Sequence, residues 1–182
     1  LQAVVPPPPA CAKRFFKPAV ADETPVIFTE TPGLYGLKGE VSDDPDFKVP
    51  IGKARLAREG TDVTLVAYSR MVQVCMAAAD LLEKDGINAE VIDLRSLLPL
   101  DTESIFSSVA KTHRAVVVYE DWKSGGFGAE IHARISESCF DDLDAPVGRV
   151  GGLNVPMPYA RVLELQCIPS ERDVVAAVQK LG

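Results

Sequence analysis

Four charged residues lie where two predicted strands end, and side chains of these types can take part in acid–base chemistry. They are Asp93, Arg95, Glu120 and Asp121. In open α/β folds, residues beyond the carboxyl ends of strands often line sites, and carboxylates at that edge could act as acid and base. No histidine lies in a comparable position to complete a triad with these carboxylates.

The two histidines occupy positions typical of structural residues. His113 precedes a predicted strand, and His132 lies inside a predicted helix. Neither therefore completes a triad with the strand-end carboxylates. The sequence also has no GxSxG nucleophile motif and no GxxxxGK[ST] phosphate-binding motif, which argues against an α/β-hydrolase and a P-loop nucleotidase. We assign no catalytic residue from these patterns.

A glycine-rich turn joins one predicted strand to the helix that follows. Its sequence is SGGFGAE, over residues 124–130. Backbone amides at such a helix N-terminus can hold an anion, but the full GxGxxG dinucleotide pattern is absent. The other interpretation, which we favour, is a tight turn that lets the helix and the sheet approach closely.

The composition is that of a globular protein with an acidic surface. Of 182 residues, 47% are apolar and 25% are charged, and the formal net charge is −7. An acidic balance argues against nucleic-acid binding, which needs clustered Lys and Arg. No apolar run is long enough to span a membrane. The cysteines are far apart without metal-ligand spacing, so we expect buried free thiols. They are Cys11, Cys75, Cys139 and Cys167.

Strands and helices alternate regularly from residue 61 onward. Strands are predicted over residues 62–69, 89–96, 114–120 and 146–152. Helices are predicted over residues 71–85, 101–111 and 127–139, and again from Ser170. Such alternation predicts an α/β fold, with an open, mostly parallel five-stranded sheet over residues 61–182 and helices on both faces.

The first 60 residues predict a different organisation. A strand over residues 2–5, a helix over 9–20 and a strand over 25–30 are typical of the tail of a second α/β domain, spanning residues 1–30. Residues 31–60 are rich in Gly and Pro and lack periodicity, which predicts a linker. The chain begins without Met in an apolar run, so we expect further residues upstream of it.

A proline-rich segment lies between the last predicted strand and the last predicted helix. Its sequence is PMPYA, over residues 156–160. Proline fixes an extended path at little entropic cost, and the segment is partly apolar. It is therefore interpreted either as the wall of an interface with another chain or as an ordinary surface loop.

Four segments carry a resemblance to a known family. They are DLRSLLPLD (93–101), VVVYEDWKSGGFGAEI (116–131), LDAPVGRVGG (143–152), and VPMPYA followed by LE and IPS (155–170). In this order they resemble the transketolase-like C-terminal domain of the beta subunits of thiamine-diphosphate-dependent 2-oxo-acid dehydrogenases. Residues 4–36 resemble the end of the preceding pyrimidine-binding domain. The shorter segments AYSRM, KTHR and LDAPV are most similar to the pyruvate-specific members of plastids and cyanobacteria.

The resemblance implies oxidative decarboxylation of pyruvate by an alpha-two beta-two tetramer. Thiamine diphosphate with magnesium sits between alpha and beta subunits in this family, and the acetyl group passes to lipoamide of an acetyltransferase core. The catalytic glutamate and histidine of the beta subunit lie in an earlier part of the pyrimidine-binding domain. The resemblance therefore implies no catalytic and no cofactor-binding residue in this chain.

Several alternatives stay open beside this interpretation. Beta subunits of branched-chain 2-oxo-acid and acetoin dehydrogenases share the same architecture. An alternative of another class is a non-enzymatic α/β module that binds an anion at the SGGFG turn. The resemblance to plastid members implies the plastid stroma, with the bacterial cytoplasm and the mitochondrial matrix as alternatives.

A potassium site is implied by position. Some family members hold potassium with oxygens at the end of the last helix of the pyrimidine-binding domain. The matching residues are Ala19, Val20, Asp22 and Thr24. The last carbonyls of a helix lack partners within it and point outward, so backbone oxygens are suitable ligands. An ordinary helix end is the alternative.

A docking site for the acetyltransferase is implied in the same way. The small, basic subunit-binding domain of that partner docks across the C-terminal domains of two beta subunits. The acid of the LDAP motif is Asp144, and Asp141 and Asp142 add negative potential beside it. Contacts from these carboxylates to Arg or Lys would be charge-assisted. A solvated acidic turn is the alternative.

Overall fold

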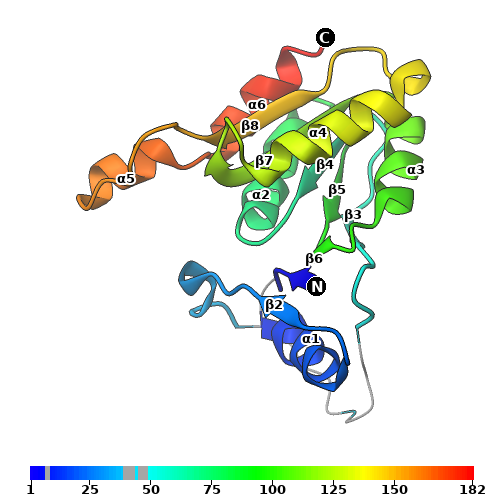
Figure 1. The fold of residues 1–182 in the computed structure, drawn as a ribbon. Coiled ribbons are helices and arrows are strands. Elements are labelled where there is room, and N and C mark those ends of the chain that lie inside the picture. The colour runs from blue at the N-terminus through cyan, green and yellow to red at the C-terminus, as the bar shows by residue number, and fades with distance from the viewer. Residues whose placement is uncertain (7–8, 39–43, 45–48) are drawn as a thin grey trace.

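The fold contains two sheets of unequal size (Figure 1). The computed structural model describes residues 1–6, 9–38, 44 and 49–182. The larger sheet has five strands in the order β3-β5-β4-β7-β8, and the smaller has three in the order β2-β1-β6. Strands β4, β5, β7 and β8 run parallel, and β3 pairs antiparallel with β5 at one edge.

The strands of the larger sheet are most buried at its centre. They are β3 (Arg55–Arg58), β4 (Val63–Ala67), β5 (Ala89–Asp93), β7 (Ala115–Trp122) and β8 (Gly148–Gly152). Every residue of β4 and β5 is buried, because helices cover both faces of a mostly parallel sheet. This explains why these strands, VTLVA and AEVID, are mostly apolar and do not alternate between apolar and polar residues.

Helices cover the larger sheet on both faces. One hydrophobic core lies between the sheet and helices α2 (Met71–Lys84) and α6 (Glu171–Gln179). The other lies between the sheet and helices α3 (Thr102–Thr112) and α4 (Phe127–Ser138). The predicted α/β class, with an open, mostly parallel sheet between two helical layers, is confirmed.

Local sequence signals position the helix ends as predicted. The Asp101 carboxylate caps α3 by accepting from the backbone N–H of Ser104 at 3.3 Å. Ser170 and Asp173 form a reciprocal capping box at the start of α6. Gly86 follows α2 with a φ of +79°, a conformation that glycine adopts without a Cβ penalty.

The smaller sheet combines two strands near the start of the chain with one strand that follows β5. It contains β1 (Gln2–Val4) and β2 (Val26–Phe28), with α1 (Pro9–Ala21) between them in sequence. Its third strand is β6 (Ser96–Leu98), which pairs antiparallel with β1. The strand predicted over residues 89–96 is thus interrupted, because Arg95 has a left-handed φ of 55° that an extended strand cannot continue.

Some short elements were not predicted. The region taken as a linker contains a 3₁₀ turn, η1 (Pro32–Leu34), and β3, whereas residues 39–43 and 45–48 lie outside the described part. A further turn, η2 (Phe140–Asp142), and a short helix, α5 (Arg161–Cys167), occur near the C-terminus. Within the described residues, no helix combines the length and the apolar character needed to cross a membrane.

Candidate interaction surfaces

The charged residues after β5 are engaged within the chain. The fully buried Asp93 carboxylate forms an ion pair with Arg55 at 3.1 Å. Burial raises the pKa of Asp93 to about 6, and the neighbouring guanidinium groups oppose this rise. The Arg95 guanidinium donates to the backbone oxygens of Lys53 and Ala54, both at 2.8 Å. These contacts join β3 to the end of β5.

The carboxylates after β7 also have partners within the chain. Glu120 lies 3.8 Å from the Arg70 guanidinium, and Asp121 accepts from the Tyr68 hydroxyl at 2.7 Å. A cavity of about 370 Å³ lies beside them, with Thr31 also among its lining residues. The ends of β4 and β7 therefore line one cavity, as α/β topology requires. Its lining includes neither Asp93 nor Arg95, and neither histidine.

Both histidines have structural surroundings. His113 ends α3 with a left-handed φ of 58°, and its Nδ1 lies 2.8 Å from the backbone oxygen of Asp142. Because a carbonyl only accepts, Nδ1 carries the proton in this contact. His132 lies on α4, where burial and the nearby Arg149 lower its pKa. These surroundings agree with the structural role expected for both residues.

The glycine turn brings α4 close to the sheet. A Cβ added at Gly128 would lie 2.0 Å from the Tyr119 ring, and one at Gly126 would lie 2.5 Å from the backbone oxygen of Trp122. Only glycine leaves room for such contacts. This geometry supports the favoured interpretation of the SGGFG sequence as a close-packing turn.

The residues predicted to hold potassium lie at the exposed end of α1. Ala19 and Val20 occupy its last turn, and the Val20 side chain is 70% exposed. Asp22 accepts from the backbone N–H of Thr24 at 2.7 Å and from the Gln2 side chain at 3.1 Å. The first of these bonds is the main cause that lowers the pKa of Asp22. The potassium site stays a prediction.

The three acids predicted to bind the acetyltransferase lie together on one exposed turn. Asp141 and Asp142 belong to η2, and Asp144 follows two residues later. His113 holds this turn at two points, because its own carbonyl also accepts from the Asp144 backbone N–H at 2.9 Å. A cavity of about 430 Å³ beside Asp144 reaches Gly182 near the C-terminal end of α6. The docking role stays a prediction.

A segment after β8 forms an exposed apolar arm, residues 153–167. It includes the proline-rich segment and α5, which lies away from the other helices (Figure 1). Two hydrogen bonds hold its base: Trp122 Nε1 donates to the Val155 oxygen at 3.1 Å, and the Leu153 N–H donates to the Cys167 oxygen at 3.0 Å. Seven apolar side chains along the arm are at least 41% exposed. They are Leu153, Val155, Met157, Tyr159, Val162, Leu163 and Leu165.

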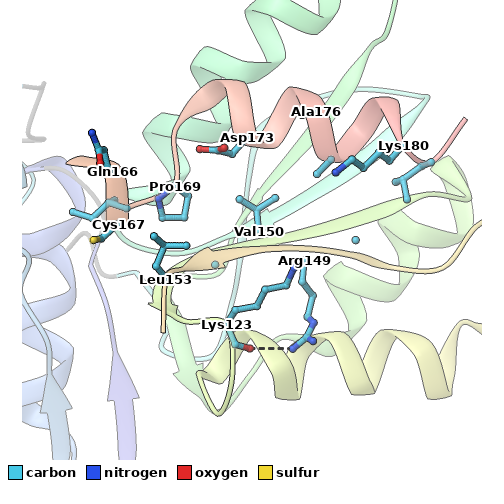
Figure 2. Close-up of a pocket in the computed structure, with 15 residues that line it drawn as sticks. Lys123, Arg149, Val150, Leu153, Gln166, Cys167, Pro169, Asp173, Ala176 and Lys180 are labelled. Atoms are coloured by element: carbon cyan, nitrogen blue, oxygen red, sulfur yellow. Dashed lines mark hydrogen bonds between the residues drawn. The ribbon is translucent and has the colours of Figure 1, made fainter. Parts of the chain in front are cut away.

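A basic groove runs along the outer edge of β8 (Figure 2). Its volume is about 450 Å³, and α6 and the chain leading into it line the other side. Three cationic side chains line it: Lys123, Arg149 and Lys180. Neither this groove nor α5 was anticipated from the sequence. The available signals were the glycine-rich GRVGG sequence of β8 and the leucines of RVLELQ.

The fold and these surfaces define the class of protein. Residues 52–174 match the family described as the C-terminal domain of transketolase, and the chain belongs to this family. The match spans β3 to the first half of α6, and so includes the larger sheet with both of its helical layers.

Three curated relatives of this chain carry the same name. The chain is 50% identical to "Pyruvate dehydrogenase E1 component subunit beta, mitochondrial" of Drosophila melanogaster, covering 93% of this chain and 48% of the relative. It is 45% identical to the protein of that name from Dictyostelium discoideum, covering 100% and 52%. For the protein from Pisum sativum the identity is 46%, with 99% and 51% covered. The chain thus spans about half the length of these relatives.

Solved structures agree with this assignment. The structure titled "Split gene transketolase, inactive beta4 tetramer" superposes with a TM-score of 0.79 at 32% identity, covering 99% of this chain and 56% of that chain. A transketolase mutant from Pichia stipitis superposes with a TM-score of 0.64 at 17% identity, covering 99% and 25%. The second likeness concerns the fold alone.

The cysteine prediction is confirmed for Cys75, Cys139 and Cys167, which are buried free thiols. The side chain of Cys11 lies outside the described part.

Proposed function

We propose that this chain is the C-terminal part of the beta subunit of a pyruvate dehydrogenase that oxidatively decarboxylates pyruvate and passes the acetyl group to lipoamide. The observation that carries the proposal is 45–50% identity to beta subunits of that name over 93–100% of this chain. The proposed division is a pyrimidine-binding domain tail over residues 1–30, a linker over 31–60 and a C-terminal domain over 61–182.

In this proposal the chain supports catalysis without performing it. The charged side chains after β5 and β7 are engaged in contacts within the chain, and the histidines have structural partners. Thiamine diphosphate with magnesium, held by the alpha subunit and by other parts of beta, would supply the electron sink for decarboxylation. The end of α1 would hold potassium through the backbone oxygens around Asp22.

Assembly is the first proposed role of the chain. The apolar arm exposes side chains that water solvates poorly, and exposed apolar patches of this kind mark interaction sites. The solved relative with a TM-score of 0.79 is titled a beta4 tetramer, and this title supports a role in assembly. We propose that the arm contributes to the contacts among alpha and beta subunits in an alpha-two beta-two tetramer.

Docking to the acetyltransferase core is the second proposed role. Asp141, Asp142 and Asp144 concentrate negative charge on one exposed turn, and His113 holds the turn in place. A basic subunit-binding domain would meet these carboxylates in charge-assisted contacts.

We propose an organellar matrix as the compartment, and the names of the relatives, including plant ones, support the mitochondrial matrix over the plastid stroma.

The experiment that tests this function compares the assembled enzyme with the chain alone. The beta subunit purified with its alpha partner is supplied with thiamine diphosphate, magnesium and an artificial electron acceptor. We expect pyruvate to be turned over much faster than branched-chain 2-oxo acids or acetoin, and we expect no turnover by the 182-residue chain. Preference for another substrate would identify a sister enzyme. No turnover of any of them would contradict the proposal and favour a non-enzymatic module.

A further inference from the structure

The outer edge of β8 carries backbone groups that face no neighbouring strand. β8 is the last strand in the order β3-β5-β4-β7-β8. The Gly152 carbonyl accepts from the Lys123 N–H at 3.1 Å, so residue 152 directs its backbone groups toward the side of β7. Alternate residues of a strand direct theirs to opposite sides. Arg149 and Gly151 therefore present their N–H and C=O groups at the open edge.

Positive charge lines this edge, where the Arg149 guanidinium donates to the backbone oxygen of Lys123 at 3.2 Å (Figure 2). Within the part of the chain that the structure describes, no ion pair joins a carboxylate to Lys123, Arg149 or Lys180. The single acid in the lining is Asp173, and its carboxylate already accepts from the Ser170 N–H at 2.8 Å and hydroxyl at 2.6 Å. The groove is thus basic on a protein whose net charge is −7.

The shape of the groove suits an extended chain. β8 reads GRVGG, so three of its five positions carry no side chain on either face of the sheet. The small residues Ala176 and Ala177 of α6 also line the groove, and Figure 2 shows Ala176 above the strand. The groove shares Leu153 and Cys167 with the base of the apolar arm, so an occupant would lie against both.

A second copy of this chain is a poor occupant. Symmetric pairing of two β8 edges would bring each Arg149 close to its counterpart and add the lysines of both grooves. Like charges placed opposite each other across paired strands are destabilising. The positive charge at the edge therefore favours a partner strand of opposite charge, whose carboxylates would pair with the three cations.

We propose that β8 is a docking edge for an extended, acidic segment of a partner protein, which adds to the larger sheet as a sixth strand. Main-chain hydrogen bonds to Arg149 and Gly151 would supply binding energy, as in other cases of strand addition. Lys123, Arg149 and Lys180 would select for Glu or Asp on the incoming strand. This site is distinct from the acidic turn, and it stands whether or not the chain belongs to a pyruvate dehydrogenase.

The test uses the 182-residue chain and a fluorescein-labelled, capped peptide of alternating glutamate and threonine. We expect saturable binding by fluorescence anisotropy, and no binding of the matched lysine–threonine peptide. The double variant Arg149→Glu/Lys180→Glu should weaken binding by about tenfold or more, since each reversed charge replaces attraction with repulsion. Arg172→Glu is the matched control, because Arg172 lies on α6 outside the groove lining, and it should change affinity less than twofold.

Amide hydrogen exchange by NMR then separates strand addition from simple charge attraction. Binding of the glutamate peptide should slow exchange at the amides of Arg149 and Gly151, whereas the amide of Val150, which faces β7, should change little. Equal binding of the two peptides, or binding that leaves both edge amides unprotected, would overturn the proposal. This measurement needs no substitution, so it is independent of how the variants fold.

Discussion

The imidazole of His113 and the backbone carbonyl of Asp142 are joined by a hydrogen bond of 2.8 Å that fixes the acidic turn against the end of α3. His113 adopts a left-handed φ of 58° in making this contact, a conformation costly for most residues with a Cβ atom. The residue is 29 positions away from Asp142 in sequence. A structural histidine thus positions the surface proposed to dock the acetyltransferase.

Replacing His113 should loosen this turn. His113→Ala keeps the strained backbone and removes the hydrogen bond, so we expect the free energy of unfolding to fall by about 1 kcal/mol. His113→Asn is the matched control, because asparagine tolerates the left-handed conformation and retains an amide donor. Urea denaturation measures both variants. An alanine variant as stable as the parent would show that the contact does not hold the turn.

The acidic turn should matter for docking more than for folding. Asp144→Asn removes an exposed charge, so we expect binding to a basic subunit-binding domain to weaken by about 1.5 kcal/mol with an unchanged unfolding midpoint. Titration calorimetry with that domain measures the effect. Asp85→Asn, which removes a charge at the end of α2, should leave the affinity unaltered. Similar losses in both variants would indicate long-range attraction instead of a specific contact.

The buried Asp93 should make stability depend on pH in a definite direction. Its pKa is about 6 in the folded chain and 3.8 without burial. The folded state therefore binds the proton more tightly, so the contribution of Asp93 to stability falls as pH rises from about 4 to about 6. Asp93→Asn should abolish this part of the slope when the free energy of unfolding is followed by urea denaturation across that range.

Arg55 opposes the rise in the Asp93 pKa, and this effect can be measured separately. Removing the guanidinium while keeping an apolar side chain, in Arg55→Met, should raise the Asp93 pKa further, because an opposite charge 3.1 Å away favours the carboxylate. Carboxyl ¹³C NMR titration reads the pKa directly. An unchanged or lower value in the variant would contradict the assigned role of Arg55.

The close approach of α4 to the sheet should make Gly128 intolerant of any side chain. In Gly128→Ala the new methyl group would lie 2.0 Å from the Tyr119 ring, which is itself fully buried. We expect a loss of about 3 kcal/mol in the free energy of unfolding, or failure to fold. Gly36→Ala is the control, because its added Cβ meets nothing within 4 Å. Equal stability of the two variants would exclude tight packing at Gly128.

The apolar arm should be needed for assembly and dispensable for folding. Val162 is 72% exposed, so Val162→Asp should leave the melting temperature of the chain within about 1 °C, since exposed sites contribute little to stability. The same change in the beta subunit should reduce recovery of the alpha–beta tetramer in analytical ultracentrifugation. Ala77→Asp, on the exposed side of α2, is the matched control. Normal tetramer formation by both variants would exclude the arm from the interface.

The sequence predicted the elements whose signals are local. Helix α2 repeats apolar residues on one face, Ser170 and Asp173 supply a capping box, and the apolar run of β4 suits a strand covered on both sides. The short strands β3 and β6 were missed because distant pairing creates them. Only contact with β1 makes a strand of residues 96–98, and only contact with β5 makes one of residues 55–58.

By itself, then, the sequence determined the α/β class and carried the resemblance to 2-oxo-acid dehydrogenase beta subunits, because periodicity, capping residues and motif order are properties of the chain as written. The tertiary structure decided which residues meet. It brought His113 to Asp142, made β8 an edge strand, and placed Lys123, Arg149 and Lys180 along one groove. Such surfaces depend on strand order and helix placement, which arise from packing between segments far apart in sequence.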